Sequence, residues 1–209
     1  MNITYVEGDL FDSLREPIES EPVVIAHVVN DKGAFGAGFV VPLAQTFPVA
    51  RQAYLAWAGK ENKSPGSVDW HPSFERGQSQ LVRVREDPVI YVAHMLAQTL
   101  GGKRPLFYND LARAMDAVVR AMHQVMPQTM FRIICPMFGA GLAGGDWNFV
   151  EKLIEDCWVR RNIPVTVYYL PRFLPENWTP PKLECDHPWH RNPALITPCP
   201  ECGAGWYEQ

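Results

Sequence analysis

Blocks of apolar residues alternate with polar stretches along this chain, and their spacing predicts its secondary structure. Residues 22–29 form an unbroken apolar run of strand length, which is typical of a strand covered on both faces. Residues 80–85 and 89–94 alternate well enough to be two strands, and the intervening Glu86-Asp87-Pro88 predicts a hairpin turn. With the shorter apolar runs included, strands are expected at residues 3–6, 22–29, 80–85, 89–94, 131–135 and 164–170.

Apolar residues three to four positions apart predict helices between these strands. The clearest case is residues 106–126, where apolar side chains fall on one helical face and charged or polar side chains on the other. Further helices are expected at residues 40–47, 49–57 and 150–158. Residues 58–79 are rich in Gly, Lys, Asn, Ser and Pro and lack periodicity, so they are expected to form an exposed loop.

Strands and helices alternate through most of residues 1–172, which predicts an α/β fold. The expected architecture is a three-layer α/β/α sandwich around a mixed, mostly parallel sheet. The composition changes after Pro171: the remaining residues are rich in proline, hold three of the five cysteines and show no periodic pattern. We therefore expect one domain at residues 1–172 and a small, loop-built tail at residues 173–209.

Composition narrows the classes of function. With 209 residues, of which 47% are hydrophobic, the chain can bury one substantial core. A net charge of −4 and the lack of a long basic run argue against extended binding of nucleic acid. No leader-like segment and no apolar window of membrane-spanning length are visible, so a soluble, cytoplasmic protein without a membrane partner is expected. Cys135 and Cys157 lie in apolar segments and the cysteine count is odd, so a disulfide framework is not expected.

Two glycine-rich turns carry the first chemical signal. Gly33 to Gly38 and Gly139 to Gly145 each follow a buried strand and precede a helical pattern, where free backbone N–H groups favour an anion. In an open α/β sheet both turns would lie at one edge, and two converging loops suit a pyrophosphate. The alternative is that the glycines only make tight turns. Gly139 to Gly144 also matches a dinucleotide-binding fingerprint, but no acidic residue ends the next strand, so that interpretation is rejected.

The tail carries the second signal. Cys199-Pro200-Glu201-Cys202 is a knuckle that directs two thiolates toward one point. Cys185 together with His190, or alternatively His187, would complete a tetrahedral zinc site. A structural Zn²⁺ would explain how so short a segment folds as a zinc-ribbon-like unit. The alternative is a disordered or simply reduced tail.

Three motifs, taken together, identify a family. Gly8-Asp9-Leu10 follows the first strand, His27-Val28-Val29-Asn30-Asp31 precedes the first glycine turn, and the stretch from Phe138 to Trp147 precedes a helix. In these motifs and their order the chain resembles the macrodomains, modules that bind ADP-ribose, as far as about Arg172. Within that family it is similar to the bacterial and phage-type branch related to ADP-ribose-1″-phosphate phosphatases and terminal ADP-ribose glycohydrolases.

The resemblance implies a role for each matching residue. Asp9 corresponds to the acid that binds adenine, with Leu10 beside it, although a turn-capping aspartate is the alternative. Asn30 corresponds to the asparagine that hydrogen-bonds the distal ribose. Phe173, or Tyr169, would pack against the adenine, although core packing is the better explanation for either aromatic residue taken alone. The two phosphate loops would be formed by Gly36, Ala37, Gly38 and Phe39 and by Gly139, Ala140, Gly141 and Leu142.

Catalysis is the least determined part of the resemblance. His27 and Asp31 flank Asn30 and are the acid/base candidates there, although a buried strand histidine and a turn aspartate are the alternatives. The glycohydrolase branch uses a lysine where this chain has Ala97-Gln98-Thr99, and an aspartate where it has Ala143. A covalent lysine mechanism is therefore not expected, unless Lys103 reaches the site.

Asp146 does not replace the missing aspartate, because its place directly before a helical pattern favours a helix N-cap. We expect a protein that binds ADP-ribose or an ADP-ribosylated substrate and hydrolyses a group at C1″, without a catalytic cofactor. The alternative is a non-catalytic reader of ADP-ribose whose zinc-stabilised tail docks a protein partner.

Overall fold

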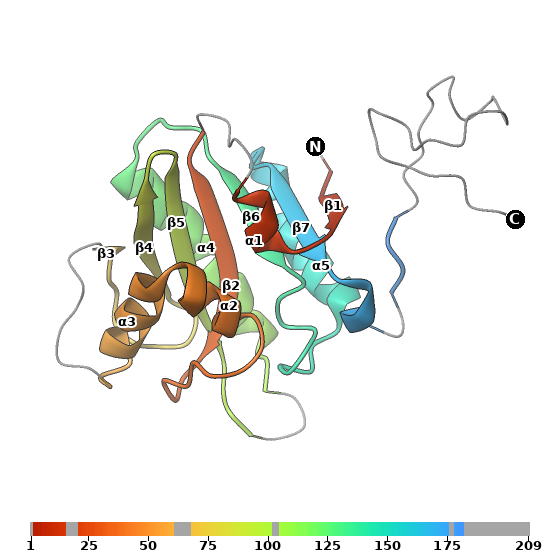
Figure 1. Cartoon of the computed structure of the whole chain (residues 1–209), viewed down its shortest axis with the longest axis horizontal. Helices are drawn as coiled ribbons and strands as arrows, with labels where there is room; N and C mark the ends of the chain where they lie inside the picture. The colour runs from red at the N-terminus through yellow and green to blue at the C-terminus, as the bar shows by residue number, and fades with distance from the viewer. Residues whose placement is uncertain (1, 16–20, 61–67, 102–104, 176–177, 182–209) are drawn as a thin grey trace, which may run out of the picture. The chain divides into compact units, whose positions relative to one another are not determined.

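Seven strands form one sheet in the described part of the chain. The computed structural model describes residues 2–15, 21–60, 68–101, 105–175 and 178–181, and it divides into a compact first unit, Met1–Trp178, and a second unit, Thr179–Gln209. The strand order in the sheet is β1-β7-β6-β2-β5-β4-β3 (Figure 1). The strands are β1 (Thr4–Glu7), β2 (Val23–Asn30), β3 (Val68–Trp70), β4 (Ser79–Glu86), β5 (Val89–Gln98), β6 (Arg132–Pro136) and β7 (Val165–Tyr169).

Helices cover both faces of this sheet. α1, α2 and α3 lie on one face, and α4 and α5 lie on the other (Figure 1). The predicted three-layer α/β/α architecture is therefore confirmed, and the four helices that the spacing predicted correspond to α2 to α5. The helical segments are α1 (Leu10–Ser13), α2 (Val40–Thr46), α3 (Pro48–Trp57), α4 (Tyr108–Val125), α5 (Trp147–Cys157) and the 3-10 turns η1 (Val159–Arg161) and η2 (Pro171–Phe173).

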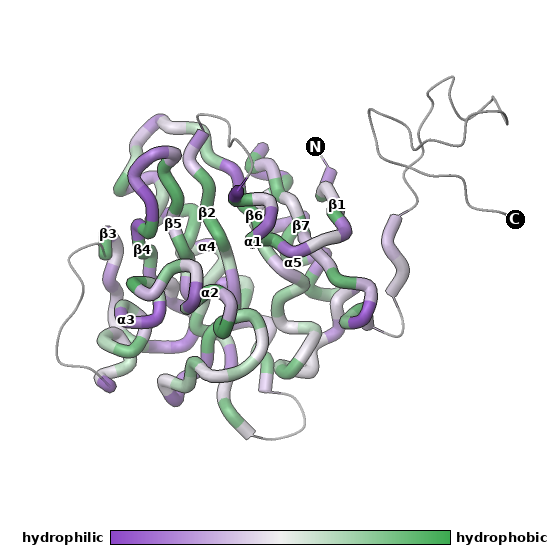
Figure 2. The backbone as a smooth tube through the Cα atoms, in the orientation of Figure 1, coloured by the Kyte–Doolittle hydropathy of each residue, from purple (hydrophilic) through white to green (hydrophobic). Residues whose placement is uncertain are grey.

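The apolar run that forms β2 packs against both helical layers. Val24 and Ala26 belong to the core beneath α4 and α5, whereas Val23 and Ile25 belong to the core beneath α1 and α2. Because strand side chains alternate between faces, both sets of residues must be apolar, which explains the unbroken run. Apolar residues follow β2 and β5 through the middle of the sheet (Figure 2).

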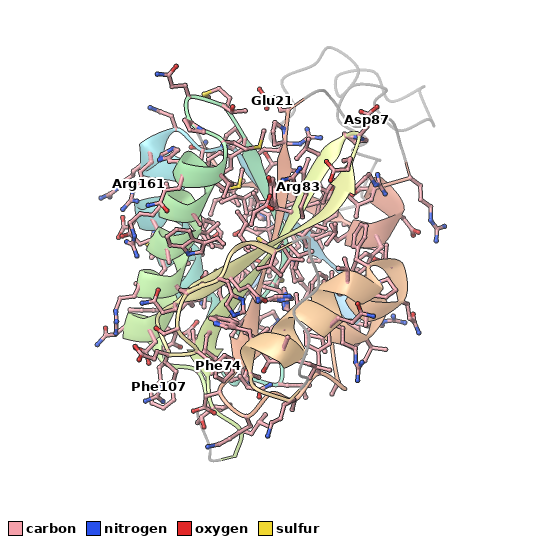
Figure 3. The ribbon with its side chains drawn as sticks, turned by 90° about the vertical axis from the view of Figure 1, so that its left-hand side faces the viewer. Glu21, Phe74, Arg83, Asp87, Phe107 and Arg161 are labelled. Atoms are coloured by element: carbon pink, nitrogen blue, oxygen red, sulfur yellow. The ribbon has the colours of Figure 1, made fainter. Side chains whose placement is uncertain are left out.

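Five strands of the sheet are parallel. β1, β7, β6, β2 and β5 run in one direction, β4 pairs antiparallel with β5 through the predicted hairpin, and β3 pairs antiparallel with β4. The edge at which the five parallel strands end is called the carboxyl edge below. Phe107, which follows β5, lies at this end of the molecule with Phe74, opposite Glu21 and Asp87 (Figure 3).

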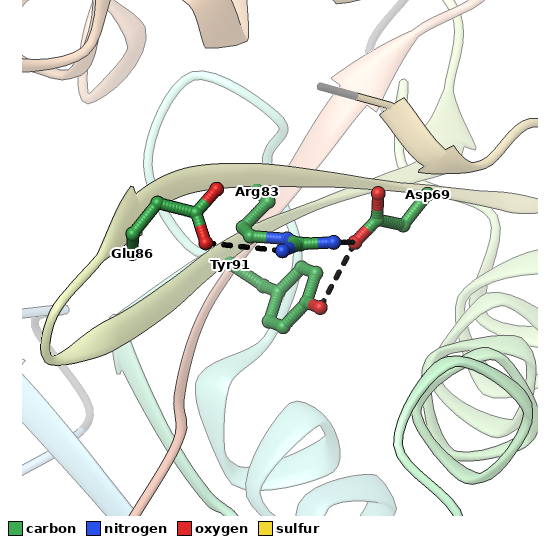
Figure 4. A network of polar contacts seen from close by, with 4 residues as sticks. All are labelled: Asp69, Arg83, Glu86 and Tyr91. Atoms are coloured by element: carbon green, nitrogen blue, oxygen red, sulfur yellow. Dashed lines mark hydrogen bonds and ion pairs between the residues drawn. The ribbon is translucent and has the colours of Figure 1, made fainter. Parts of the chain in front are cut away.

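The expected loop at residues 58–79 contains β3, so that expectation is wrong in part. Three residues are too few to show a period, and side-chain contacts hold this strand to the sheet edge (Figure 4). Arg83 on β4 donates to Asp69 Oδ2 from Nε at 2.9 Å and from Nη2 at 2.7 Å. Tyr91 on β5 donates to the same oxygen at 2.9 Å. Burial raises the pKa of Tyr91 to about 12, and this hydrogen bond acts in the same direction.

The first unit continues to Trp178, although the composition suggested a boundary at residue 172. The Trp178 ring is 8% exposed and lies 5.0 Å from Tyr5, 5.9 Å from Tyr169 and 6.5 Å from Trp147, measured between ring centroids. These contacts attach it to β1, β7 and α5. Among the described residues, no helix combines the length and the apolar composition that crossing a membrane requires.

Candidate functional site

The carboxyl edge brings together most of the residues that the sequence singled out. Asp9 follows β1, Asn30 ends β2, Gly139 follows β6, and Phe173 follows β7. Parallel strands place these segments side by side because each enters the edge from the same direction. Below, residues 31–39 are called the first loop and residues 137–146 the second loop.

Asn30 shapes the first loop with its side chain. Its Oδ1 accepts from the backbone N–H of Lys32 at 3.0 Å and of Ala34 at 3.1 Å, and its Nδ2 donates to the Ala34 carbonyl at 2.7 Å. The residue is only 8% exposed. One hydrogen of Nδ2 is not used in these bonds and can serve another acceptor, such as the predicted ribose oxygen.

Tyr54 on α3 fixes the start of the first loop from the protein interior. Its hydroxyl donates to the Asn30 carbonyl at 2.5 Å, and the side chain is fully buried. Burial raises the pKa of Tyr54, so the hydroxyl keeps its proton and remains a donor. Sequence patterns could not identify this contact, because Tyr54 reads as an ordinary core position of its helix.

Gly36, Ala37 and Gly38 form the exposed part of the first loop, between the inward-packed rings of Phe35 and Phe39. Gly38 has φ of +72°, a conformation that costs an L-residue roughly 1–2 kcal/mol. The predicted phosphate contacts therefore fall on backbone that is accessible and free of large side chains.

The second loop closes on itself through backbone hydrogen bonds. The N–H of Gly145 donates to the Gly139 carbonyl at 2.8 Å, and the N–H of Gly144 to that of Gly141 at 2.9 Å. A Cβ at Gly145 would lie 2.7 Å from the Gly139 oxygen, so this position requires glycine. Ala143 in this loop is buried, with 5% exposure.

The two loops meet above β2 and β6. A Cβ built on Gly38 would lie 3.5 Å from Cδ1 of Leu142, and Leu142 itself is 75% exposed. Asp146 caps α5, as the sequence predicted: its side chain accepts from the N–H of Asn148 at 3.0 Å. Beside this cap, Tyr108, Gly144, Asp146 and Phe149 line an open depression of about 290 Å³.

The predicted adenine-binding residues lie at the β1 and β7 end of the edge. Asp9 is exposed and caps α1, accepting from the N–H of Phe11 at 2.9 Å. Leu10 is buried in the core, with 3% exposure. Phe173 is 70% exposed, with the Arg172 guanidinium 4.9 Å from its ring centroid. The short helix α1 was not among the helices that the spacing of apolar residues predicted.

His27 pairs with His94 inside the protein. Nε2 of His27 lies 2.7 Å from Nδ1 of His94, and Nε2 of His94 lies 2.9 Å from the Ala50 carbonyl oxygen. A carbonyl only accepts, so we assign the proton of His94 to Nε2; its Nδ1 must then accept from His27. Both rings are neutral in this arrangement. Burial lowers the pKa of both, that of His94 to about 4, and the neighbouring His94 lowers that of His27 further.

This pairing places His27 beneath the first loop. Its ring centroid lies 5.6 Å from that of Phe39 and 6.1 Å from that of Phe35, and the residue is 2% exposed. Nδ1 is buried and has no hydrogen-bond partner among the described residues. The ring therefore supports the loop and presents no nitrogen at the surface.

Asp31 is the acid/base candidate that reaches the surface of the edge. It is partly exposed, and its Oδ1 accepts from Thr99 Oγ1 at 2.9 Å. Its backbone N–H donates to the Gln98 carbonyl at 2.9 Å. Neither Thr99 nor His94 could be identified as a site residue from the sequence, because their relation to Asp31 and His27 depends on the pairing of β2 with β5.

The predicted zinc ligands cannot be placed. Cys185, His187, His190, Cys199 and Cys202 all lie outside the described residues. Within the ranges that the structure describes, no group of three or more His, Cys, Asp or Glu side chains is arranged to hold a metal ion.

Comparison with known proteins agrees with this fold. No protein-family model matches the chain. The ADP-ribose 1″-phosphate phosphatase of Debaryomyces hansenii is 23% identical over 191 residues, which cover 79% of this chain and 98% of that protein. A protein of unknown function from Bacteroides thetaiotaomicron is 29% identical, with a TM-score of 0.65 and coverage of 81% of this chain and 99% of that one.

A macrodomain protein from Streptomyces coelicolor is 34% identical, with a TM-score of 0.60, and the match covers 80% of this chain and 98% of that one. Identity at this level extends over nearly the whole of that relative. The chain described here belongs to the macrodomain family.

Proposed function

We propose that this macrodomain binds ADP-ribose along the carboxyl edge and hydrolyses a group at C1″ of the distal ribose. The meeting of the two glycine-rich loops, with Gly38 and Leu142 in contact range, carries the proposal. Their backbone N–H groups, at the ends of two adjacent parallel strands, suit the two phosphates of a pyrophosphate.

The order of the strands suggests the orientation of the ligand. We place the adenine against Asp9 and Phe173, which follow β1 and β7. We place the distal ribose against Asn30, which ends β2. From β1 to β5 the sheet spans four strand spacings, roughly 19 Å at about 4.8 Å each. This length accommodates a base, a pyrophosphate and two riboses laid in a row.

The chemistry is assigned to Asp31 acting on water. A water held by the Asp31 carboxylate would attack the phosphorus of a phosphate at C1″ while its proton passes to the carboxylate. The bond from phosphorus to the C1″ oxygen breaks, and this oxygen takes up a proton to give ADP-ribose and inorganic phosphate. Loop N–H groups would stabilise the charge that develops. The phosphatase name of the Debaryomyces relative favours phosphate as the leaving group; an ADP-ribosyl linkage is the other candidate.

His27 is assigned a supporting role in this proposal. With 2% exposure and its Nε2 proton directed at His94, the ring is not available to take a proton from water. A lysine-linked intermediate is not proposed either, because Ala97, Gln98 and Thr99 occupy the end of β5 where the glycohydrolase branch has its lysine.

Binding is tested by calorimetry with ADP-ribose on the full chain and on two matched glycine variants. Gly38→Ala and Gly59→Ala each force alanine into a positive φ, +72° and +66°, without a close steric contact. Each should therefore lose roughly 1–2 kcal/mol of stability. Only Gly38→Ala should weaken ADP-ribose binding, by about tenfold or more. Equal affinities for the two variants, or no binding by the parent chain, would refute the site.

Turnover is tested with ADP-ribose-1″-phosphate and with ADP-ribosylated protein or DNA. Asp31→Asn should keep ADP-ribose affinity within about tenfold and lose most of kcat, because it removes the base and keeps the side-chain shape. Tight binding by the parent chain without any turnover would instead identify a reader of ADP-ribose.

A further inference from the structure

Thr99 and Asp31 form a side-chain pair that spans the β2–β5 junction at the carboxyl edge. The Thr99 hydroxyl donates to Asp31 Oδ1 at 2.9 Å, and both residues are partly exposed. Among the described residues this is the only side-chain hydrogen bond to the Asp31 carboxylate. Oδ2 is left without a protein partner there.

A register shift in the sheet creates this pair. Val29 is opposite Leu96, but Asn30 is opposite Gln98, so β5 contributes one extra residue at the end of the ladder. In an unshifted register Asn30 would face Ala97, and Asp31 would face Gln98. The irregularity advances β5 by one position and so brings Thr99 beside Asp31.

Backbone contacts hold both partners in place. The Asp31 N–H donates to the Gln98 carbonyl at 2.9 Å, and the Thr99 N–H donates to the Pro105 carbonyl at 3.0 Å. The bridge between Gln98 and Leu106 closes the base of the β5–α4 connection. The Thr99 hydroxyl is therefore presented from hydrogen-bonded backbone, and its own hydrogen bond limits rotation of the carboxylate.

We propose that Thr99 is a positioning residue that orients the Asp31 carboxylate for proton transfer. The proposal rests on the hydrolytic function proposed above. With Oδ1 engaged by Thr99, Oδ2 is the oxygen that receives the proton of the attacking water. A general base must be held within hydrogen-bond reach of the proton that it abstracts, and a small misplacement of the base lowers the rate by a large factor.

The test compares Thr99→Val, which removes the hydroxyl and keeps the side-chain shape, with Thr99→Ser, which keeps the hydroxyl. Thr99→Val should lower kcat by about 10-fold to 100-fold on ADP-ribose-1″-phosphate and leave KM and ADP-ribose affinity within about threefold. Thr99→Ser should retain kcat within about threefold. Thr129→Val is the matched control, because it removes an exposed hydroxyl that bonds the Pro127 carbonyl, outside the site; its kcat should be unchanged.

A double-variant cycle identifies the partner of Thr99. In an Asp31→Asn background, Thr99→Val should have no further effect on kcat, because the residue acts only through that carboxylate. If the parent chain turns over substrate, three results would overturn the positioning role alone. They are an unchanged kcat in Thr99→Val, an inactive Thr99→Ser variant, or additive effects of the two substitutions in the cycle. A parent chain that binds ADP-ribose but turns over none of the substrates would overturn the hydrolytic function and this inference together.

Discussion

Lowering the pH from 7 to 5 should destabilise the folded protein through the buried His27–His94 pair. In the unfolded chain each histidine titrates near pH 6.5. In the folded protein burial lowers both pKa values, that of His94 to about 4. Above pH 6.5 both histidines are neutral in the folded and in the unfolded protein, so the folded protein has its full stability with respect to this pair. Between pH 6.5 and 4 only the unfolded chain takes up protons at these sites, so stability falls as the pH falls.

The magnitude follows from the difference in pKa. Each histidine that stays neutral in the folded state contributes a slope of about 1.4 kcal/mol per pH unit. For His94, the 1.5 units between pH 6.5 and 5 correspond to about 2 kcal/mol. His27 adds a loss in the same direction, because its pKa also lies well below 6.5.

Urea unfolding at pH 7, 6, 5.5 and 5 measures this loss as a change in the free energy of unfolding. The comparison is a His27→Gln/His94→Gln double variant, which should be less stable at pH 7 and should show a flatter dependence on pH. Carboxylates and the remaining histidines are common to both proteins, so they contribute equally to the two slopes. Parallel slopes between pH 6.5 and 5 would refute the buried, neutral pair.

Three further predictions test contacts elsewhere. Trp178→Ala should lower the free energy of unfolding by about 3 kcal/mol, measured by thermal unfolding, since the ring is buried against three aromatic neighbours. An unchanged Tm would show that Trp178 does not pack in the first unit. Tyr54→Phe should cost about 1 kcal/mol, by removing a buried hydrogen bond to the Asn30 carbonyl, and should weaken ADP-ribose binding; stability and affinity equal to the parent would contradict that anchor. Cys199→Ser should abolish a stoichiometric zinc detectable by elemental analysis of the purified chain; metal-free parent protein would exclude the predicted zinc site.

Local sequence patterns predicted an element correctly wherever its structure depends on residues close together in the chain. The amphipathic spacing of α4, the hairpin between β4 and β5, and the capping aspartate of α5 all depend on residues close in sequence. The two glycine turns were recognisable for the same reason, because each follows its strand directly. Their convergence at one edge followed from a general rule about parallel strands, and the structure confirms it.

Contacts between strands distant in sequence could not be obtained in this way. β3 is held by the Asp69–Arg83 contact, which becomes visible only when β4 lies beside it. His27 was a catalytic candidate because it flanks Asn30, and only the pairing of β2 with β5 shows that its Nε2 lies 2.7 Å from Nδ1 of His94. Sequence proximity to a loop does not determine on which face of a strand a side chain lies relative to a ligand.

The sequence by itself determined that this protein is an α/β domain whose glycine-rich loops follow buried strands, because turn chemistry and hydrophobic period are local properties. Tertiary structure alone decided which polar groups meet. The pairing of β2 with β5, shifted by one residue at its end, joins Asp31 to Thr99 and His27 to His94. Such pairs depend on the register of strands more than sixty residues apart in the chain, and a shift of one residue would give Asp31 a different neighbour.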